Sequence, residues 1–106
     1  MADRESNALK ILKEELLFIR NTLDSVDKTK FLNDEIIQHA IAMSLISIGE
    51  AANRLSDQYK EKYPEIEWPK IIAVRNIAAH GYGQLDMQQI WQAMVDDIPL
   101  LEKTFL

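Results

Sequence analysis

One short stretch of the chain, residues 75–82, combines four side chains whose chemistry suits a phosphodiester. It reads Arg75-Asn76-Ile77-Ala78-Ala79-His80-Gly81-Tyr82, which places a permanent cation, an amide, an imidazole and a phenol close together in sequence. Arginine can grip phosphate oxygens with two donors, and histidine can take or give a proton near neutral pH. These residue types favour cleavage of RNA, because the ribose 2′-OH is a nucleophile already present in the substrate.

Such a cleavage needs a base for the 2′-OH, an acid for the leaving oxygen and a cation for the phosphorane, and one histidine cannot comfortably perform both proton transfers. Asn76 and His80 are one helical turn apart and share a face. Arg75 and His80 are five residues apart, about 140° around an ideal helix. We therefore expect either that the helix unwinds at Gly81 or that the pair works with residues from a second subunit.

A purely structural interpretation of the same residues is also open. Arg75 could pair with an acidic neighbour, and His80 could cap a helix C-terminus, where the helix dipole favours imidazolium. Glu50 sits among apolar and small residues, so its carboxylate needs a partner. That partner is either Arg54, one turn later, or the Arg75 and His80 site itself.

The remaining conspicuous side chains are predicted to be structural. His39 has no second ligand at metal-binding spacing, so we expect a structural or surface histidine. Trp68 and Trp91 lie outside any basic stretch and are expected to be core or interface anchors. The sequence offers no motif for a metal or a cofactor, and we predict neither.

Helical periodicity predicts the elements that position these residues. Apolar side chains recur at steps of three and four in segments 3–23, 33–56, 69–80 and 86–106, and small side chains at 44, 47, 49, 51 and 52 allow close helix packing. The polar stretch 24–30 is predicted to be a connection. Gly81 is expected to end the third helix and 81–85 to form a loop. Asp86 with Gln89 predicts an N-cap, and Pro99 predicts a kink or break near Ile98.

Composition limits the class of protein. The 106 residues suit one domain, 1–106, and 47% hydrophobic residues with three glycines and three prolines favour an all-α fold. The chain has no cysteine, its N-terminus lacks an apolar signal core, and its apolar stretches are too short for a bilayer, so we expect a cytoplasmic protein without membrane contact. A formal charge of −5 argues against an extended basic surface that binds nucleic acid. RNA contact is then expected to be local or shared with a second chain.

Several motifs in order make the chain resemble a known family. Residues 48–52 (IGEAA), 63–66 (YPEI) followed by Trp68, the R-x4-H-x-Y pattern over 75–82, and Trp91 followed by 97–100 (DIPL) are similar to the HepT-like toxins, a branch of the HEPN superfamily. The resemblance covers nearly the whole chain and is densest from 48 to 101. It implies a HEPN-type up-and-down helical bundle of four main helices, with a short extra helix allowed.

The resemblance also implies a function. Members of the family act as metal-independent endoribonucleases, the toxins of bacterial and archaeal toxin–antitoxin modules, in which two protomers line a shared cleft. Arg75 and His80 would be catalytic and Asn76 supporting. A minimal nucleotidyltransferase antitoxin would silence the enzyme by transferring AMP to Tyr82. Two other interpretations stay open: a non-catalytic module that binds a nucleotide or the nucleotidyltransferase, and a helical oligomerisation protein.

Overall fold

The computed structural model describes the backbone of residues 2–84 and 86–106 and the side chains of 4–79 and 86–106. Within these residues every regular element is helical, which confirms the predicted all-α class. In chain order the elements are α1 (Ala2–Leu23), α2 (Lys28–Leu32), α3 (Glu35–Arg54), α4 (Asp57–Lys60), α5 (Trp68–Gln84), α6 (Met87–Asp96) and α7 (Pro99–Phe105).

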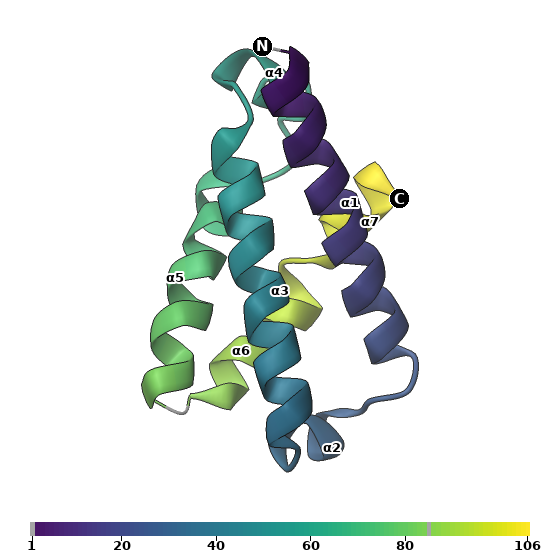
Figure 1. Cartoon of the computed structure of the whole chain (residues 1–106), viewed down its shortest axis with the longest axis vertical. Helices are drawn as coiled ribbons and strands as arrows, with labels where there is room; N and C mark the ends of the chain where they lie inside the picture. Colours follow the sequence, from purple (N-terminus) through teal and green to yellow (C-terminus); the bar gives the residue numbers. More distant parts are fainter. Residues whose placement is uncertain (1, 85) are drawn as a thin grey trace.

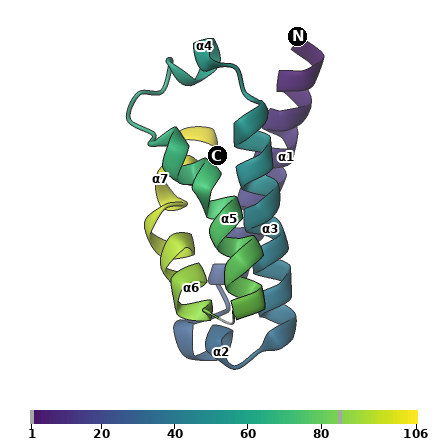
Figure 2. The same ribbon diagram turned by 90° about the vertical axis from the view of Figure 1, so that its left-hand side faces the viewer.

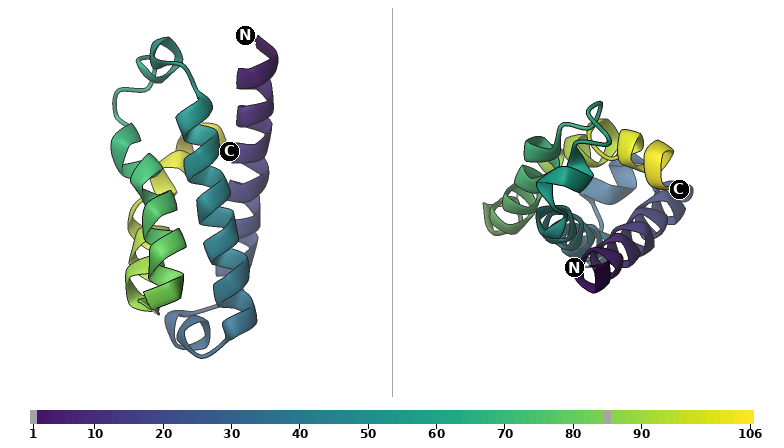
Figure 3. Two further views of the ribbon diagram at one scale, coloured as in Figure 1. Left: turned by 60° about the vertical axis from the view of Figure 1, so that its left-hand side comes forward. Right: turned by 90° about the horizontal axis from the view of Figure 1, so that it is seen from above.

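The long helices run alternately up and down along the long axis of the molecule, with α3 between α1 and α5 (Figure 1). The α3 helix makes its most extensive contacts with α5 and α1 and also contacts α2 and α6, so it is the central helix of the bundle. The α6 and α7 helices cover the other side of this layer (Figure 2). Viewed along the long axis, the helices are arranged around a common centre (Figure 3), and the buried apolar side chains form one core cluster.

The core is built from the apolar stripes that the sequence predicts. On α1 the stripe Leu12, Leu16 and Ile19 is fully buried, and on α3 so are Ile41, Leu45 and Ile48. Burial of one such side chain is worth roughly 1.5–3 kcal/mol, so these stripes hold the helices in register. Fully buried apolar side chains in the second half of the chain include Val74, Ala78, Ile90, Ile98 and Leu101.

Side-chain caps fix where four helices begin. Asp27, Asp34, Ser56 and Asp86 each accept a hydrogen bond from the backbone N–H three residues later, at 2.8, 3.1, 3.0 and 3.1 Å. One such cap is worth roughly 1 kcal/mol. The predicted cap of Asp86 on the Gln89 amide is therefore confirmed. The predicted break at Pro99 is also confirmed, because α6 ends at Asp96 and Pro99 occupies the first turn of α7.

Three predicted boundaries were wrong. The stretch 24–30 is not only a connection, because Asp27 caps the short helix α2. The second segment is shorter than 33–56, since Asp34 caps its start and Leu55 leaves the helix with extended backbone at ψ 140°. Residues 57–60 then form the separate helix α4.

The third correction bears on the candidate site. The α5 helix does not stop near His80 but continues to Gln84, so the backbone of residues 81–84 is helical and not a loop. Two glycines in a helix cost roughly 1 kcal/mol each, which weakens the helix without ending it. The extensive packing of α5 on α3 offsets such a cost. The next helix, α6, begins at Met87.

Candidate functional site

The α5 helix turns Arg75 and Asn76 away from the core. Ile71, Val74 and Ala78 are buried on its inner face, Ile72 and Ile77 pack against the edge of the core, and positions 73, 75 and 76 are exposed. The side chain of Arg75 is 47% exposed, and Asn76 beside it is also exposed. A cation is thus presented to solvent on a helix whose other face is fixed by the core.

Two contacts orient the guanidinium of Arg75. Its Nε lies 3.7 Å from Oε2 of Glu50 on α3, and its Nη1 donates a hydrogen bond of 3.2 Å to Oδ1 of Asn76. Of the two partners considered for Glu50, the structure therefore records Arg75. Both members of this ion pair are half-exposed, so the pair is worth at most about 1 kcal/mol and its main effect is on orientation.

A glycine sets the separation of the two helices at this point. A Cβ atom added to Gly49 of α3 would collide with the Cβ of Arg75 and would lie only 3.1 and 3.2 Å from its backbone N and Cα. Ordinary contacts between carbon atoms lie at about 3.5–4.0 Å. Gly49 therefore lets the backbone of Arg75 approach α3, which brings Glu50 within reach of the guanidinium.

His80 and Tyr82 lie in the C-terminal part of α5, and their side chains fall outside the described residues. The backbone is helical throughout, so the predicted unwinding at Gly81 does not occur. On an ideal helix positions 75 and 80 are about 140° apart, whereas positions 75 and 82 differ by only about 20°. Arg75 and Tyr82 therefore occupy one helical stripe, about 10 Å apart along the axis.

The other conspicuous residues lie where the sequence suggests. Trp68 is 7% exposed and donates from its indole N–H to the carbonyl of Lys60 at 3.1 Å. Trp91 packs on Phe31 with ring centroids 5.4 Å apart. Both are structural anchors, as predicted. His39 is exposed on α3, with Nδ1 2.8 Å from the carbonyl oxygen of Glu35.

Two features near the site were not predicted. The contact between Gly49 and Arg75 joins different helices, and the sequence signals it only through the small residues around 49. The outer face of α3 also carries exposed apolar side chains, Ile36 at 82% and Met43 at 62% exposure. These two positions and Glu50 are spaced seven residues apart, which places them on one stripe of the helix.

The described residues form neither a metal site nor a membrane-spanning helix. Among the described side chains, those of 4–79 and 86–106, no group of three or more histidine, cysteine, aspartate or glutamate residues is arranged to hold a metal ion. In the same part of the chain, none of the helices has the length and apolar character to cross a membrane.

Comparison with known proteins decides the family. The family model described as "Ribonuclease HepT-like" matches residues 12–105. The chain belongs to the ribonuclease HepT-like family. The match spans Gly49, Glu50 and the whole motif from Arg75 to Tyr82. The predicted family is thereby confirmed, and the helical bundle described above is the HepT-like fold of this chain.

Individual relatives agree with this assignment. The HepT-like chain is 33% identical over 75 residues to "Probable ribonuclease HepT" of Thermococcus cleftensis. The aligned region covers 71% of this chain and 68% of the relative. The chain is 31% identical over 78 residues to "Putative RNase MJ1380" of Methanocaldococcus jannaschii, covering 74% and 72%. It is 28% identical over 95 residues to "Putative RNase TTE0752" of Caldanaerobacter subterraneus, covering 90% and 85%. No solved structure matches the chain.

Proposed function

We propose that this HepT-like protein is a metal-independent endoribonuclease and the toxin of a toxin–antitoxin module. The observation that carries the proposal is the presentation of Arg75. Its guanidinium is half-exposed on a helix whose inner face is buried in the core, oriented by Glu50 and Asn76, at the start of the R-x4-H-x-Y motif. The membership of the chain in a ribonuclease family supports RNA as the substrate class.

In the proposed mechanism the RNA carries its own nucleophile. A base removes the proton of the 2′-OH, and the oxygen attacks the adjacent phosphorus. The bond to the 5′-oxygen breaks, and an acid protonates this leaving oxygen, which yields a 2′,3′-cyclic phosphate and a free 5′-OH. Arg75 binds the phosphate oxygens and stabilises the charge of the phosphorane, and His80 transfers protons. Asn76 holds the guanidinium through its Oδ1.

Two protomers would complete the site. One His80 cannot serve well as both base and acid, whereas a dimer supplies two copies. The exposed stripe Ile36 and Met43 leads along α3 to Glu50, which contacts Arg75. Exposed apolar side chains of this kind favour burial against a partner surface. A symmetric pairing through this stripe would bring the two Arg75 sites to one interface.

Regulation would act on the tyrosine of the same motif. A minimal nucleotidyltransferase antitoxin would transfer AMP from ATP to Tyr82. The phenol oxygen loses its proton and bonds to the α-phosphorus, and the bond to the β-phosphate breaks to release pyrophosphate. Position 82 lies on the stripe of Arg75, about two helical turns away. The added phosphate would place a negative charge where RNA must bind and would compete for the cation.

The proposal is tested by incubating purified wild-type protein, with Tyr82 shown to be unmodified by intact mass, with RNA and with DNA of the same sequence. We expect cleavage of RNA alone, unchanged by EDTA, and loss of cleavage in His80→Ala and Arg75→Ala. In cells the His80→Ala protein should no longer inhibit growth. Binding of nucleotide or RNA without cleavage by the wild type would instead identify a non-catalytic binding module.

A further inference from the structure

A concave surface lies at the N-terminal end of α5, on the same helix as Arg75. It is an open groove of about 850 Å³ between α4, the segment that follows it and the first turns of α5. Its lining combines apolar side chains with charged residues of α4 and the next turn. The lining residues are Asp57, Lys60, Glu61, Pro64, Ile66, Trp68, Pro69 and Ile72.

The apolar floor of the groove is held rigidly. The indole N–H of Trp68 donates to the carbonyl of Lys60 at 3.1 Å, which fixes the ring against α4. The same ring packs toward Phe105 of α7, with centroids 6.2 Å apart. Ile66 is buried beneath the groove, while Pro64 and Pro69 are exposed at its surface. A preformed apolar surface of this kind can accept a side chain at a low entropic cost.

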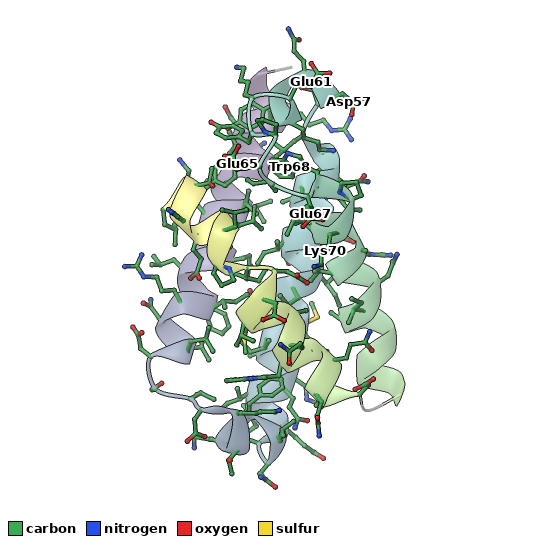
Figure 4. The ribbon with its side chains drawn as sticks, turned by 180° about the vertical axis from the view of Figure 1, so that it is seen from behind. Asp57, Glu61, Glu65, Glu67, Trp68 and Lys70 are labelled. Atoms are coloured by element: carbon green, nitrogen blue, oxygen red, sulfur yellow. The ribbon has the colours of Figure 1, made fainter. Side chains whose placement is uncertain are left out.

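The charge around this floor is negative. Asp57, Glu61, Glu65 and Glu67 are all exposed, and Figure 4 shows their side chains distributed around Trp68. The nearest cation on α5, Lys70, is engaged elsewhere, because its Nζ lies 3.1 Å from Oδ1 of Asp97. Asp97 raises the pKa of Lys70 through a hydrogen bond and its charge, so this lysine keeps its proton. Lys60 in the wall and the exposed Lys62, whose Nζ lies 5.4 Å from the centroid of the Tyr59 ring, offset only part of the negative charge of these four carboxylates.

We infer that this groove, defined by the lining above, binds a segment of a partner protein that carries an apolar side chain flanked by lysine or arginine. The apolar floor accepts the apolar side chain, and the carboxylates of Asp57 and Glu61 attract the flanking cations. The same carboxylates repel the phosphates of RNA, so a polynucleotide is the poorer match. The groove is therefore a protein-docking surface.

The position of the groove gives such docking a consequence for the neighbouring site. Ile72, at one end of the lining, precedes Arg75 and Asn76 by three and four residues on α5, so the three positions share a face of the helix. A segment seated on Ile72 would lie one turn from the guanidinium. Such a segment would hinder access of RNA to Arg75, and this consequence rests on the proposed function. The docking itself does not depend on the proposed function.

The test selects short random peptides displayed on phage against the full chain and measures the enriched peptides by tryptophan fluorescence. The Trp91→Phe background leaves Trp68 as the single tryptophan, since the chain has two. We expect enrichment of peptides with an aromatic or aliphatic residue between cations, and a change in Trp68 emission on binding. The double variant Asp57→Lys/Glu61→Lys should bind these peptides roughly tenfold more weakly.

A matched control separates the groove from general charge. The control variant Glu14→Lys/Asp24→Lys reverses the charge of two exposed carboxylates, one on α1 and one directly after its last residue. It should leave peptide affinity unchanged. Equal loss in both double variants, enrichment of acidic peptides, or no enrichment would overturn the inference. So would a change in Trp68 emission caused by single-stranded RNA and strengthened by the groove variant. Arg75→Ala should retain peptide binding, so failure of the nuclease proposal would leave this result unaffected.

Discussion

Replacement of Gly49 by alanine tests how the two central helices place Arg75. The new Cβ would meet the Cβ of Arg75 and would lie 3.1 and 3.2 Å from its backbone N and Cα. Two of these three atoms belong to the backbone of α5, so a side-chain rotation cannot relieve the contact. The helices must separate by some tenths of an ångström before ordinary contacts of about 3.5–4.0 Å are restored.

The expected change in stability is the difference between two effects. Overpacking of this kind costs roughly 1–3 kcal/mol. Alanine is favoured over glycine in a helix by roughly 0.8–1.0 kcal/mol, which offsets part of that cost. The free energy of unfolding should therefore fall by up to about 2 kcal/mol, and a loss of 1 kcal/mol would lower Tm by roughly 4–8 °C in a domain of this size.

Gly49→Ala should also lower the rate of RNA cleavage, beyond any loss of folded protein. The movement of α5 pulls the guanidinium of Arg75 away from Glu50, with which it now makes a 3.7 Å contact. Because small misplacements of catalytic groups can cost up to about 100-fold in rate, we expect a drop in RNA cleavage of roughly tenfold or more. Cleavage is measured with the protein at a temperature where circular dichroism shows it folded.

Asn53→Ala is the control for helix propensity, because Asn53 is exposed on the same helix and the change removes atoms instead of adding them. It should be neutral or stabilising by a few tenths of a kcal/mol. If Gly49→Ala gained stability as a simple propensity change and cleaved RNA at the wild-type rate, the argument from close approach would be refuted.

Three further changes address other parts of the account. Glu50→Gln keeps an acceptor oxygen that can still orient the guanidinium of Arg75 but removes the negative charge that competes with phosphate for it. We therefore expect a KM for RNA a few-fold lower and a free energy of unfolding within about 0.5 kcal/mol of wild type, checked by steady-state kinetics and denaturant titration. A higher KM would speak against this competition. Glu102→Gln addresses a carboxylate whose pKa is raised mainly by burial, with Oε2 lacking a partner among the described residues. Folding favours the neutral form of Glu102, so the stability of the wild type falls as pH rises above the ordinary glutamate range. The Gln variant should therefore be more stable than wild type at pH 7 but not at pH values below that range. A stability difference that stays constant across pH would contradict this cause. If the outer face of α3 is the dimer surface, Met43→Lys should weaken self-association, measured by analytical ultracentrifugation, by about tenfold or more. Leu100 is exposed on α7, so Leu100→Lys is the control and should leave self-association unchanged.

The sequence predicted most of the fold because its information is local. The stripes on α1 and α3 follow from spacing alone, and the cap at Asp86 and the break at Pro99 follow from single residue types. The short helix α2 was missed because its five residues show no period, and only the cap at Asp27 signals it. The end of α5 was placed too early because glycine was interpreted as a stop, whereas packing against α3 supports the helix through Gly81.

The candidate site was only partly predictable. Motif spacing selected Arg75 and Asn76 as candidates, and the structure joins their side chains by a local hydrogen bond. The partner of Glu50 could not be decided, since Arg54 and Arg75 were both compatible with the sequence. That choice depends on how α3 and α5 cross, and Gly49 sets the crossing through a contact between residues far apart in the chain. The acidic groove around Trp68 likewise depends on the path of the chain between α4 and α5.

The most direct test of the central claim, that Arg75 holds a phosphodiester attacked by its own ribose, uses one RNA oligonucleotide that the wild-type protein cleaves at a single position. Product masses are measured for this RNA and for the same RNA with hydrogen in place of the 2′-OH at that nucleotide, both in EDTA. We expect a 2′,3′-cyclic phosphate from the first, no cleavage of the second, and a rate at least roughly 100-fold lower with Arg75→Ala. Cleavage of the 2′-deoxy substrate, or an Arg75→Ala protein as fast as wild type, would contradict the claim.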